Sequence, residues 1–146
     1  MKIDQEFPTS LEAIYASYNS INKTKKEQIK QKYKLISGKA KLKYYAYLIG
    51  KIMGDGHLSL NYNIIFSSAC KADLINLKRF VINWFKISEK RFKIYFKVAK
   101  GASYALVIND AIFTRGLHSL GAPRGKKVNQ SFLIPKWIKG SGLYTK

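Results

Sequence analysis

The segment YLIGKIMGDGHL, residues 47–58, determines the fold that the sequence predicts. Its apolar residues follow helical spacing up to a stop made of glycine, aspartate and glycine. Gly50 and Gly54 are four residues apart, so they lie on one face of the predicted helix. Asp55 closes that helix and is the only acidic residue among residues 28–72, a stretch rich in lysine. The function of Asp55 is therefore the first question that the sequence raises.

The position of Asp55 is unfavourable for stability alone, because a carboxylate at a helix C-terminus faces the negative end of the helix dipole. Glycines such as Gly50 and Gly54 let two helix backbones approach closely, and a second copy of the helix fits by two-fold symmetry. Two Asp55 carboxylates would then meet and hold a divalent cation, with Mg²⁺ the expected one. Such a metal would activate water against a phosphodiester. The alternative is that Gly54-Asp55-Gly56 is an ordinary turn.

The composition indicates one domain with an anionic partner. The chain has 146 residues, 47% of them hydrophobic, and a net charge of +19. A surplus of this size favours nucleic acid as the partner, with an anionic membrane surface second. Cys70 is the only cysteine, which excludes an intramolecular disulfide and a zinc finger. Since no secretory signal or membrane span is recognised, we expect an intracellular protein, cytoplasmic or organellar, that is not secreted.

Residues 1–38 are predicted to form an N-terminal helical extension, and residues 39–146 the main domain. Within the extension, Ser10 is expected to cap a first helix, and Thr24 with Glu27 to form a capping box for a second. The extension is either a small helix-turn-helix accessory unit or a pair of helices that brace the main domain.

The main domain is predicted to be α+β, in the order helix, hairpin, helix, hairpin, helix. The expected helices cover about residues 40–54, 71–86 and 110–120, and the hairpins pair 57–60 with 63–68 and 91–98 with 103–109. The middle helix carries an apolar stripe made of Leu74, Leu77, Val81 and Trp84.

The outward faces of both hairpins are predicted to be polar. In residues 91–98, the apolar set Phe92, Ile94, Phe96 and Val98 alternates with the polar set Arg91, Lys93, Tyr95 and Lys97. The first hairpin places neutral polar side chains outward, namely Ser59, Asn61, Asn63 and Ser67. A basic antiparallel ribbon fits the major groove of DNA, where side chains reach base edges. The alternative is a plain solvated face in a lysine-rich protein.

Residues 48–56, LIGKIMGDG, resemble the nine-residue signature of the LAGLIDADG homing endonucleases. Five positions match letter for letter: Leu48, Gly50, Ile52, Asp55 and Gly56. Gly54 replaces a small alanine, and Met53 stands where the signature has its first aspartate. Residues 121–138, GAPRGKKVNQSFLIPKWI, resemble the segment that archaeal-type and intein-associated members carry after their second hairpin.

The resemblance implies an αββαββα fold whose saddle-shaped sheet straddles double-stranded DNA. It implies that Leu48, Gly50 and Gly54 lie at a homodimer interface and that Asp55 binds the catalytic Mg²⁺. Lys127 occupies the position of a catalytic lysine near the scissile phosphate, with Lys126 as its neighbour. Arg124 and Lys126 are expected to contact DNA, and both lysines are alternatively ordinary phosphate-positioning cations.

The sequence thus predicts a site-specific, Mg²⁺-dependent DNA endonuclease without a small-molecule substrate. It is either a one-signature homodimer or a truncated remnant of a two-repeat enzyme. A second hypothesis is a DNA- or RNA-binding relative that does not cleave, maturase-like or regulatory. A third is a basic RNA-packing protein unrelated to the family.

Overall fold

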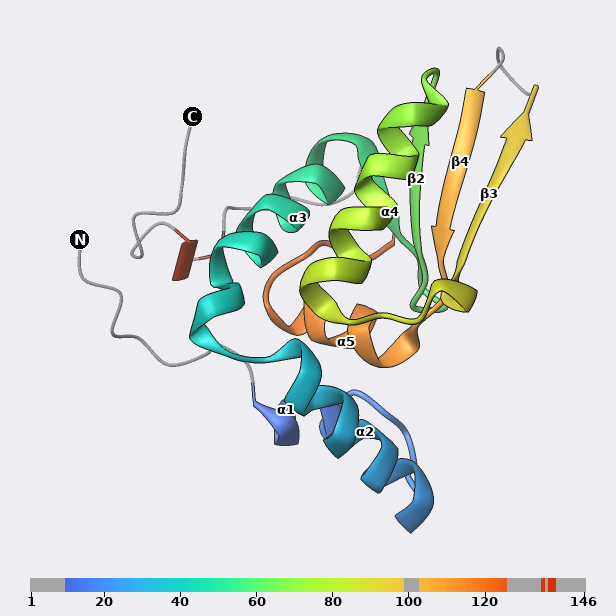
Figure 1. Cartoon of the computed structure of the whole chain (residues 1–146). Coiled ribbons are helices and arrows are strands. Elements are labelled where there is room, and N and C mark those ends of the chain that lie inside the picture. Colours follow the sequence, from blue (N-terminus) through green and yellow to red (C-terminus); the bar gives the residue numbers. More distant parts are fainter. Residues whose placement is uncertain (1–9, 99–102, 126–134, 136, 139–146) are drawn as a thin grey trace.

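The structure is a computed structural model that describes residues 10–98, 103–125, 135 and 137–138. Its elements follow one another in the predicted α+β order (Figure 1). The helices are α1 (Leu11–Ala16), α2 (Lys23–Ile36), α3 (Leu42–Asp55), α4 (Lys71–Phe85) and α5 (Ala111–Ser119), with short 3₁₀ turns at Lys39–Lys41 and Glu89–Arg91. The strands are β1 (Gly56–Leu58), β2 (Ile64–Ser68), β3 (Phe92–Lys97) and β4 (Ser103–Ile108). The predicted hairpins and the three predicted helices of the main domain are therefore confirmed.

The four strands form one antiparallel sheet in the order β1-β2-β4-β3. Each hairpin keeps its own two strands adjacent, and the hairpins join through β2 and β4, where Phe66 lies opposite Leu106. Leu106 in turn lies opposite Ile94 of β3. Because side chains alternate along a strand, these three residues share one face of the sheet.

Helices α3 and α4 cover this face, as Figure 1 shows. The side of α3 that faces the sheet consists of Tyr45, Leu48, Ile49 and Ile52, each at most 1% exposed. These residues are spaced three and four apart, which is the pattern of an apolar stripe on a helix. The hydrophobic core lies between these helices and the sheet and extends to α5.

The second helix of the extension begins at a different residue from the one predicted. Asn22 caps α2, its Oδ1 accepting a hydrogen bond from the backbone N–H of Lys25 at 2.7 Å. Thr24 therefore lies inside the helix, and the capping box with Glu27 was wrong. Asparagine is as good an N-cap as threonine or better, so the earlier residue takes the position. The cap by Ser10 on α1 is confirmed, with Ala13 N–H donating to its hydroxyl at 3.1 Å.

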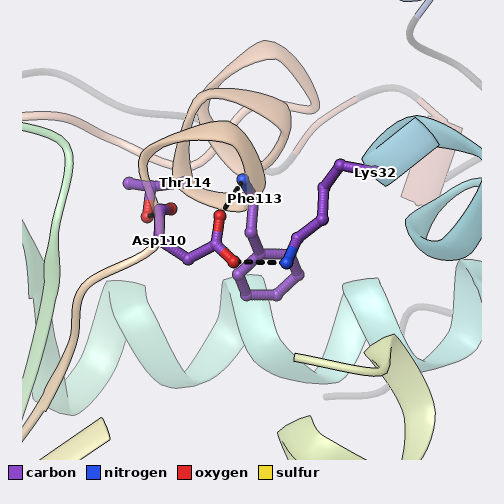
Figure 2. A network of polar contacts seen from close by, with 4 residues as sticks. All are labelled: Lys32, Asp110, Phe113 and Thr114. Carbon is purple, nitrogen blue, oxygen red and sulfur yellow. Dashed lines mark hydrogen bonds and ion pairs between the residues drawn. The ribbon is translucent and has the colours of Figure 1, made fainter. Parts of the chain in front are cut away.

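The extension packs on α5 through a buried ion pair. Asp110 precedes α5 and accepts a hydrogen bond from the Phe113 N–H at 3.1 Å, so it caps the helix. Its other carboxylate oxygen lies 2.6 Å from Lys32 Nζ of α2 (Figure 2). The Thr114 hydroxyl donates to the Asp110 carbonyl at 2.8 Å. Since Asp110 is only 3% exposed, the chain joins α2 to α5 with a shielded charge pair.

Three predicted core positions are instead exposed. Phe96 and Val98 are 53% and 73% exposed; Phe96 lies on β3, the edge strand of the sheet, and Val98 directly follows that strand. Trp84 was predicted to lie on the buried stripe of α4 but is 43% exposed. Its ring stacks on Tyr44 of α3 at a centroid distance of 4.0 Å, and Phe85 takes the buried position.

Among the described residues, no helix combines the length and the apolar character needed to cross a bilayer.

Candidate nucleic-acid interface and carboxylate site

The face of the sheet opposite α3 and α4 carries four of the ten predicted DNA-binding residues: Ser67, Lys93, Tyr95 and Lys97. We call it the outer face; the strand register places on it His57, Ile65, Ser67, Ala105, Val107, Lys93, Tyr95, Lys97 and Ser103. No helix of the described part of the chain covers it (Figure 1). Its centre is apolar, since Ala105 is buried and Ile65 and Val107 are half-buried. Polar and cationic side chains surround that centre.

The cations of β3 lie at the edge of this face. Lys93 is exposed, and Tyr95 is 44% exposed. Lys97 is half-buried and donates a hydrogen bond from Nζ to the Ser67 hydroxyl at 2.8 Å, which links the outermost strand to β2 across β4. The alternation predicted for Lys93, Tyr95 and Lys97 is confirmed, whereas their contact with DNA stays a prediction.

A row of polar residues borders the outer face where the strands end. Ser59 donates to Asn63 Oδ1 at 2.7 Å, and Asn63 Nδ2 donates to Asn109 Oδ1 at 3.4 Å. The Asn109 N–H donates to the carbonyl of Arg91 at 2.7 Å. We call Ser59, Asn63, Asn109 and Arg91 the polar edge row. The contacts among Ser59, Asn63 and Asn109 order side chains that can present hydroxyl and amide groups to a ligand, whereas Arg91 takes part through its backbone carbonyl.

Two predicted DNA contacts have local structural partners. Asn61 lies in the turn between β1 and β2 rather than on a strand, and its N–H donates to the Ser59 hydroxyl at 3.2 Å. Arg124 donates from Nη2 to the Leu60 carbonyl at 2.9 Å. Its guanidinium lies 4.2 Å from the centroid of the Tyr62 ring, and that of Arg115 lies 4.0 Å from the same ring. Arg124 therefore holds the first hairpin against the segment after α5.

Asp55 is the last residue of α3, as predicted, and its side chain is 69% exposed. Among the described residues it pairs with Lys51, one turn earlier, at 4.0 Å between Nζ and Oδ2. An exposed pair at this distance contributes little to stability, at most about 1 kcal/mol. The next residue, Gly56, begins β1, so Asp55 lies at the point where the chain passes from α3 into the edge strand of the sheet.

The two faces of α3 separate the three predicted dimer-interface residues. Leu48 is completely buried in the core of its own chain, so its side chain offers no surface to a second copy; that assignment was wrong. Gly50 and Gly54 lie on the exposed side, and a Cβ placed on either would meet no atom within 4 Å. Tyr47 shares this side and is 51% exposed. The surface formed by Tyr47, Gly50 and Gly54, the glycine stripe, leads along the helix to Asp55.

Asp55 does not form a metal site by itself within the described part of the chain. No group of three His, Cys, Asp or Glu side chains suited to a metal ion occurs within the described ranges. Mg²⁺ commonly keeps several waters and binds through one or two carboxylates together with phosphate oxygens. In a dimer, two Asp55 carboxylates together with the backbone of a nucleic acid would satisfy that requirement, so the residue would fit the metal there.

The two remaining predicted residues, Lys126 and Lys127, lie outside the described residues. Sequence reasoning missed Asn109, Tyr62 and Asp110. Asn109 follows β4 and completes the polar edge row. The alternation along the hairpin does not reveal this role, because it depends on the order of the strands in the sheet. Asp110 precedes an apolar helix, which is the signal of an N-cap.

Comparison of the chain with models of known protein families gives no match, and comparison with curated proteins gives none either.

Proposed function

We propose that the protein binds double-stranded DNA with the outer face of its sheet and, as a homodimer through α3, hydrolyses phosphodiester bonds with Mg²⁺. The observation that carries the proposal is the exposed carboxylate of Asp55 at the end of α3, on the same helix as Gly50 and Gly54, where an added Cβ would meet no atom within 4 Å. The ion pair of Asp55 adds little to the stability of the single chain, and glycine inside a helix lowers that stability. Together the carboxylate and the glycines provide what a two-carboxylate centre at a dimer axis needs.

The sheet supports the binding part of the proposal. Lys93, Tyr95 and Lys97 line the β3 edge of the outer face, and the polar edge row borders its end. Arginine and lysine position the DNA backbone, while amide side chains of asparagine can read adenine edges. The net charge of +19 favours association with a polyanion.

The α3 helix supports the catalytic part. Gly50 and Gly54 allow the backbones of two copies to approach closely, which brings the two Asp55 carboxylates to one place. Bound there, Mg²⁺ would polarise a phosphate oxygen and lower the pKa of a water molecule. The protein's own part is to hold the carboxylates and to fix the DNA across the sheet.

A cleavage assay tests the proposal. Duplexes with a randomised centre are incubated with the protein and Mg²⁺, and the cut ends are sequenced. We expect the wild type to cut a defined site and Asp55→Asn to bind the same duplex without cutting it. The matched control is Glu12→Gln, which removes an exposed carboxylate from α1 and should leave cutting unchanged. Cutting by Asp55→Asn at the wild-type rate would refute the role of Asp55.

A second candidate function is DNA or RNA binding without cleavage. The Lys51–Asp55 ion pair favours it, because it gives the carboxylate a partner within its own helix. This function predicts metal-independent binding, no nicked product and a protein that sediments as one chain. Sedimentation as two chains, lost when Gly50 is replaced by a large residue, supports the endonuclease instead.

A further inference from the structure

An open groove of about 880 Å³ separates the N-terminal extension from the start of β3 and the start of α5. Its lining residues come mainly from α2: Lys23, Thr24, Lys25, Glu27, Gln28, Gln31, Lys32 and Leu35; the opposite wall consists of Arg91, Asp110 and Ile112. The groove is thus not part of the Asp55 site, which lies at the end of α3.

Arg91 connects this groove to the sheet. Its side chain lines the groove, and its carbonyl accepts the hydrogen bond from Asn109 that ends the polar edge row. From Arg91 the row passes through Asn109 and Asn63 to Ser59. A linear ligand on the outer face that followed this row would therefore reach the groove.

The charges in the groove favour an anion. The Lys32 ammonium and the Asp110 carboxylate neutralise each other at 2.6 Å, so neither adds net charge. Lys23 and Arg91 form no ion pair with any described residue. Lys25 Nζ lies 5.7 Å from the Tyr18 ring, and Gln28 adds an amide with hydrogen-bond donors and acceptors.

Glu27 is the one feature that opposes an anion. Its carboxylate lines the groove and accepts a hydrogen bond from Gln31 Nε2 at 2.8 Å. Three cations, Lys23, Lys25 and Arg91, outnumber this single uncompensated acid. The groove therefore keeps a net positive charge. Replacing Glu27 should strengthen the binding of an anion, whereas replacing the cations should weaken it.

We infer that this groove binds the sugar–phosphate backbone of DNA that flanks the duplex on the sheet, so that α2 extends the nucleic-acid surface. The inference rests on the proposed binding of duplex DNA by the outer face. Lys23 and Lys25 contact phosphates of the flank, and Arg91 contacts the backbone where it leaves the sheet. Contacts of this kind are independent of base sequence and add to affinity through counterion release.

The test compares two double variants with the same loss of charge on the same helix. Lys23→Gln with Lys25→Gln removes the groove cations. Lys30→Gln with Lys34→Gln removes exposed lysines of α2 that do not line the groove. Binding of a series of random-sequence duplexes of increasing length is measured by fluorescence anisotropy over a range of salt concentrations.

We expect the salt slope for the longest duplex to fall by about 2 in the groove variant, at about 0.9 for each lost phosphate contact. The control variant should lose less than half as much. Wild type and control should bind longer duplexes more tightly, whereas the groove variant should lose that gain. Circular dichroism confirms that both variants fold.

The substitution Glu27→Gln gives the opposite result, since it removes the acid from the groove. We expect tighter binding of the longest duplex and little change for the shortest. Equal behaviour of the two double variants, or no effect of Glu27→Gln, would overturn the inference while leaving binding by the sheet intact. Absence of duplex binding by the wild type would refute the proposed function itself.

Discussion

Asp55 and Asp110 lie at opposite ends of helices and in opposite environments. Asp110 precedes α5, where the helix dipole favours a carboxylate, and it is 3% exposed. It caps the helix and pairs with Lys32 at 2.6 Å. Asp55 ends α3, where the dipole disfavours a carboxylate, and its side chain is 69% exposed with one ion pair at 4.0 Å.

The comparison shows that the fold accounts for the presence of one of these two carboxylates and not of the other. Every oxygen of the Asp110 carboxylate has a structural contact, so its presence follows from the packing of α2 on α5 (Figure 2). Asp55 gives the chain little stability at a position that opposes its charge. A residue that the fold does not explain is where function is sought.

The largest expected effect is that of Asp110→Ala. The substitution leaves Lys32 without its buried partner and α5 without its cap, so we expect the free energy of unfolding to fall by about 3–5 kcal/mol. Urea unfolding followed by circular dichroism measures this value. Asp55→Ala is the matched control and should change it by no more than about 0.5 kcal/mol. Similar losses in the two variants would contradict the comparison.

A second prediction compares two glycines at the end of α3, Gly54 with open space beside it and Gly56 in close contact with the core. A Cβ at Gly56 would lie 2.7 Å from Cε1 of Phe66 and 3.0 Å from the Cα of Ile52, whereas one at Gly54 would meet nothing within 4 Å. Gly56→Ala should therefore lower the free energy of unfolding by about 1–3 kcal/mol through overpacking. Gly54→Ala should not lower it. Equal stability of the two variants would show that the helix end is open on both sides.

The amphipathic periodicity of α3 and the alternation along β3 made the order of elements predictable from the sequence. The placement of Gly50 and Gly54 on one face of α3 followed from their spacing, because residues four apart lie on the same side of a helix. Leu48 was misplaced, since the signature interleaves buried and exposed positions and the letters do not say which are which.

The parts that could not be predicted depend on contacts between distant residues. The Lys32–Asp110 pair joins two elements that are far apart in the chain, and neither residue carries a local signal of its partner. The polar edge row depends on β2 lying beside β4, which alternation along each strand does not specify. The exposure of Phe96 goes with the place of β3 at the edge of the sheet, which the alternation along β3 does not specify.

A third prediction concerns the pH dependence of stability and Tyr45, on the buried side of α3. The Tyr45 hydroxyl donates to the Ile36 carbonyl at 2.7 Å, and burial raises the pKa of Tyr45 well above its usual value. Because the folded pKa exceeds the unfolded one, this stabilisation is complete below about pH 10 and is lost as the pH rises further. Tyr45→Phe should lower the free energy of unfolding by about 1 kcal/mol at neutral pH.

Above pH 10 the difference between Tyr45→Phe and the wild type should shrink and then change sign, since phenylalanine has no proton to lose. Urea unfolding at a series of alkaline pH values measures it. The control is Tyr47→Phe, at an exposed position of the same helix, which should change the free energy of unfolding at neutral pH by no more than about 0.5 kcal/mol. A constant difference at every pH would contradict the assignment to Tyr45.

The smallest expected effect on stability is that of Gly50→Ala, which should stabilise the single chain but weaken its self-association. Gly50 lies in the middle of α3 with open space beside it, so Gly50→Ala should raise the free energy of unfolding of the single chain by up to about 1 kcal/mol. The same methyl group lies on the glycine stripe and should weaken self-association. Asn83→Ala, at an exposed position of α4, is the control that improves helix propensity without touching the stripe. Urea unfolding and sedimentation of both variants separate the effect on stability from the effect on self-association. If Gly50→Ala stabilises the chain and leaves self-association unchanged, the glycine stripe is not part of an interface.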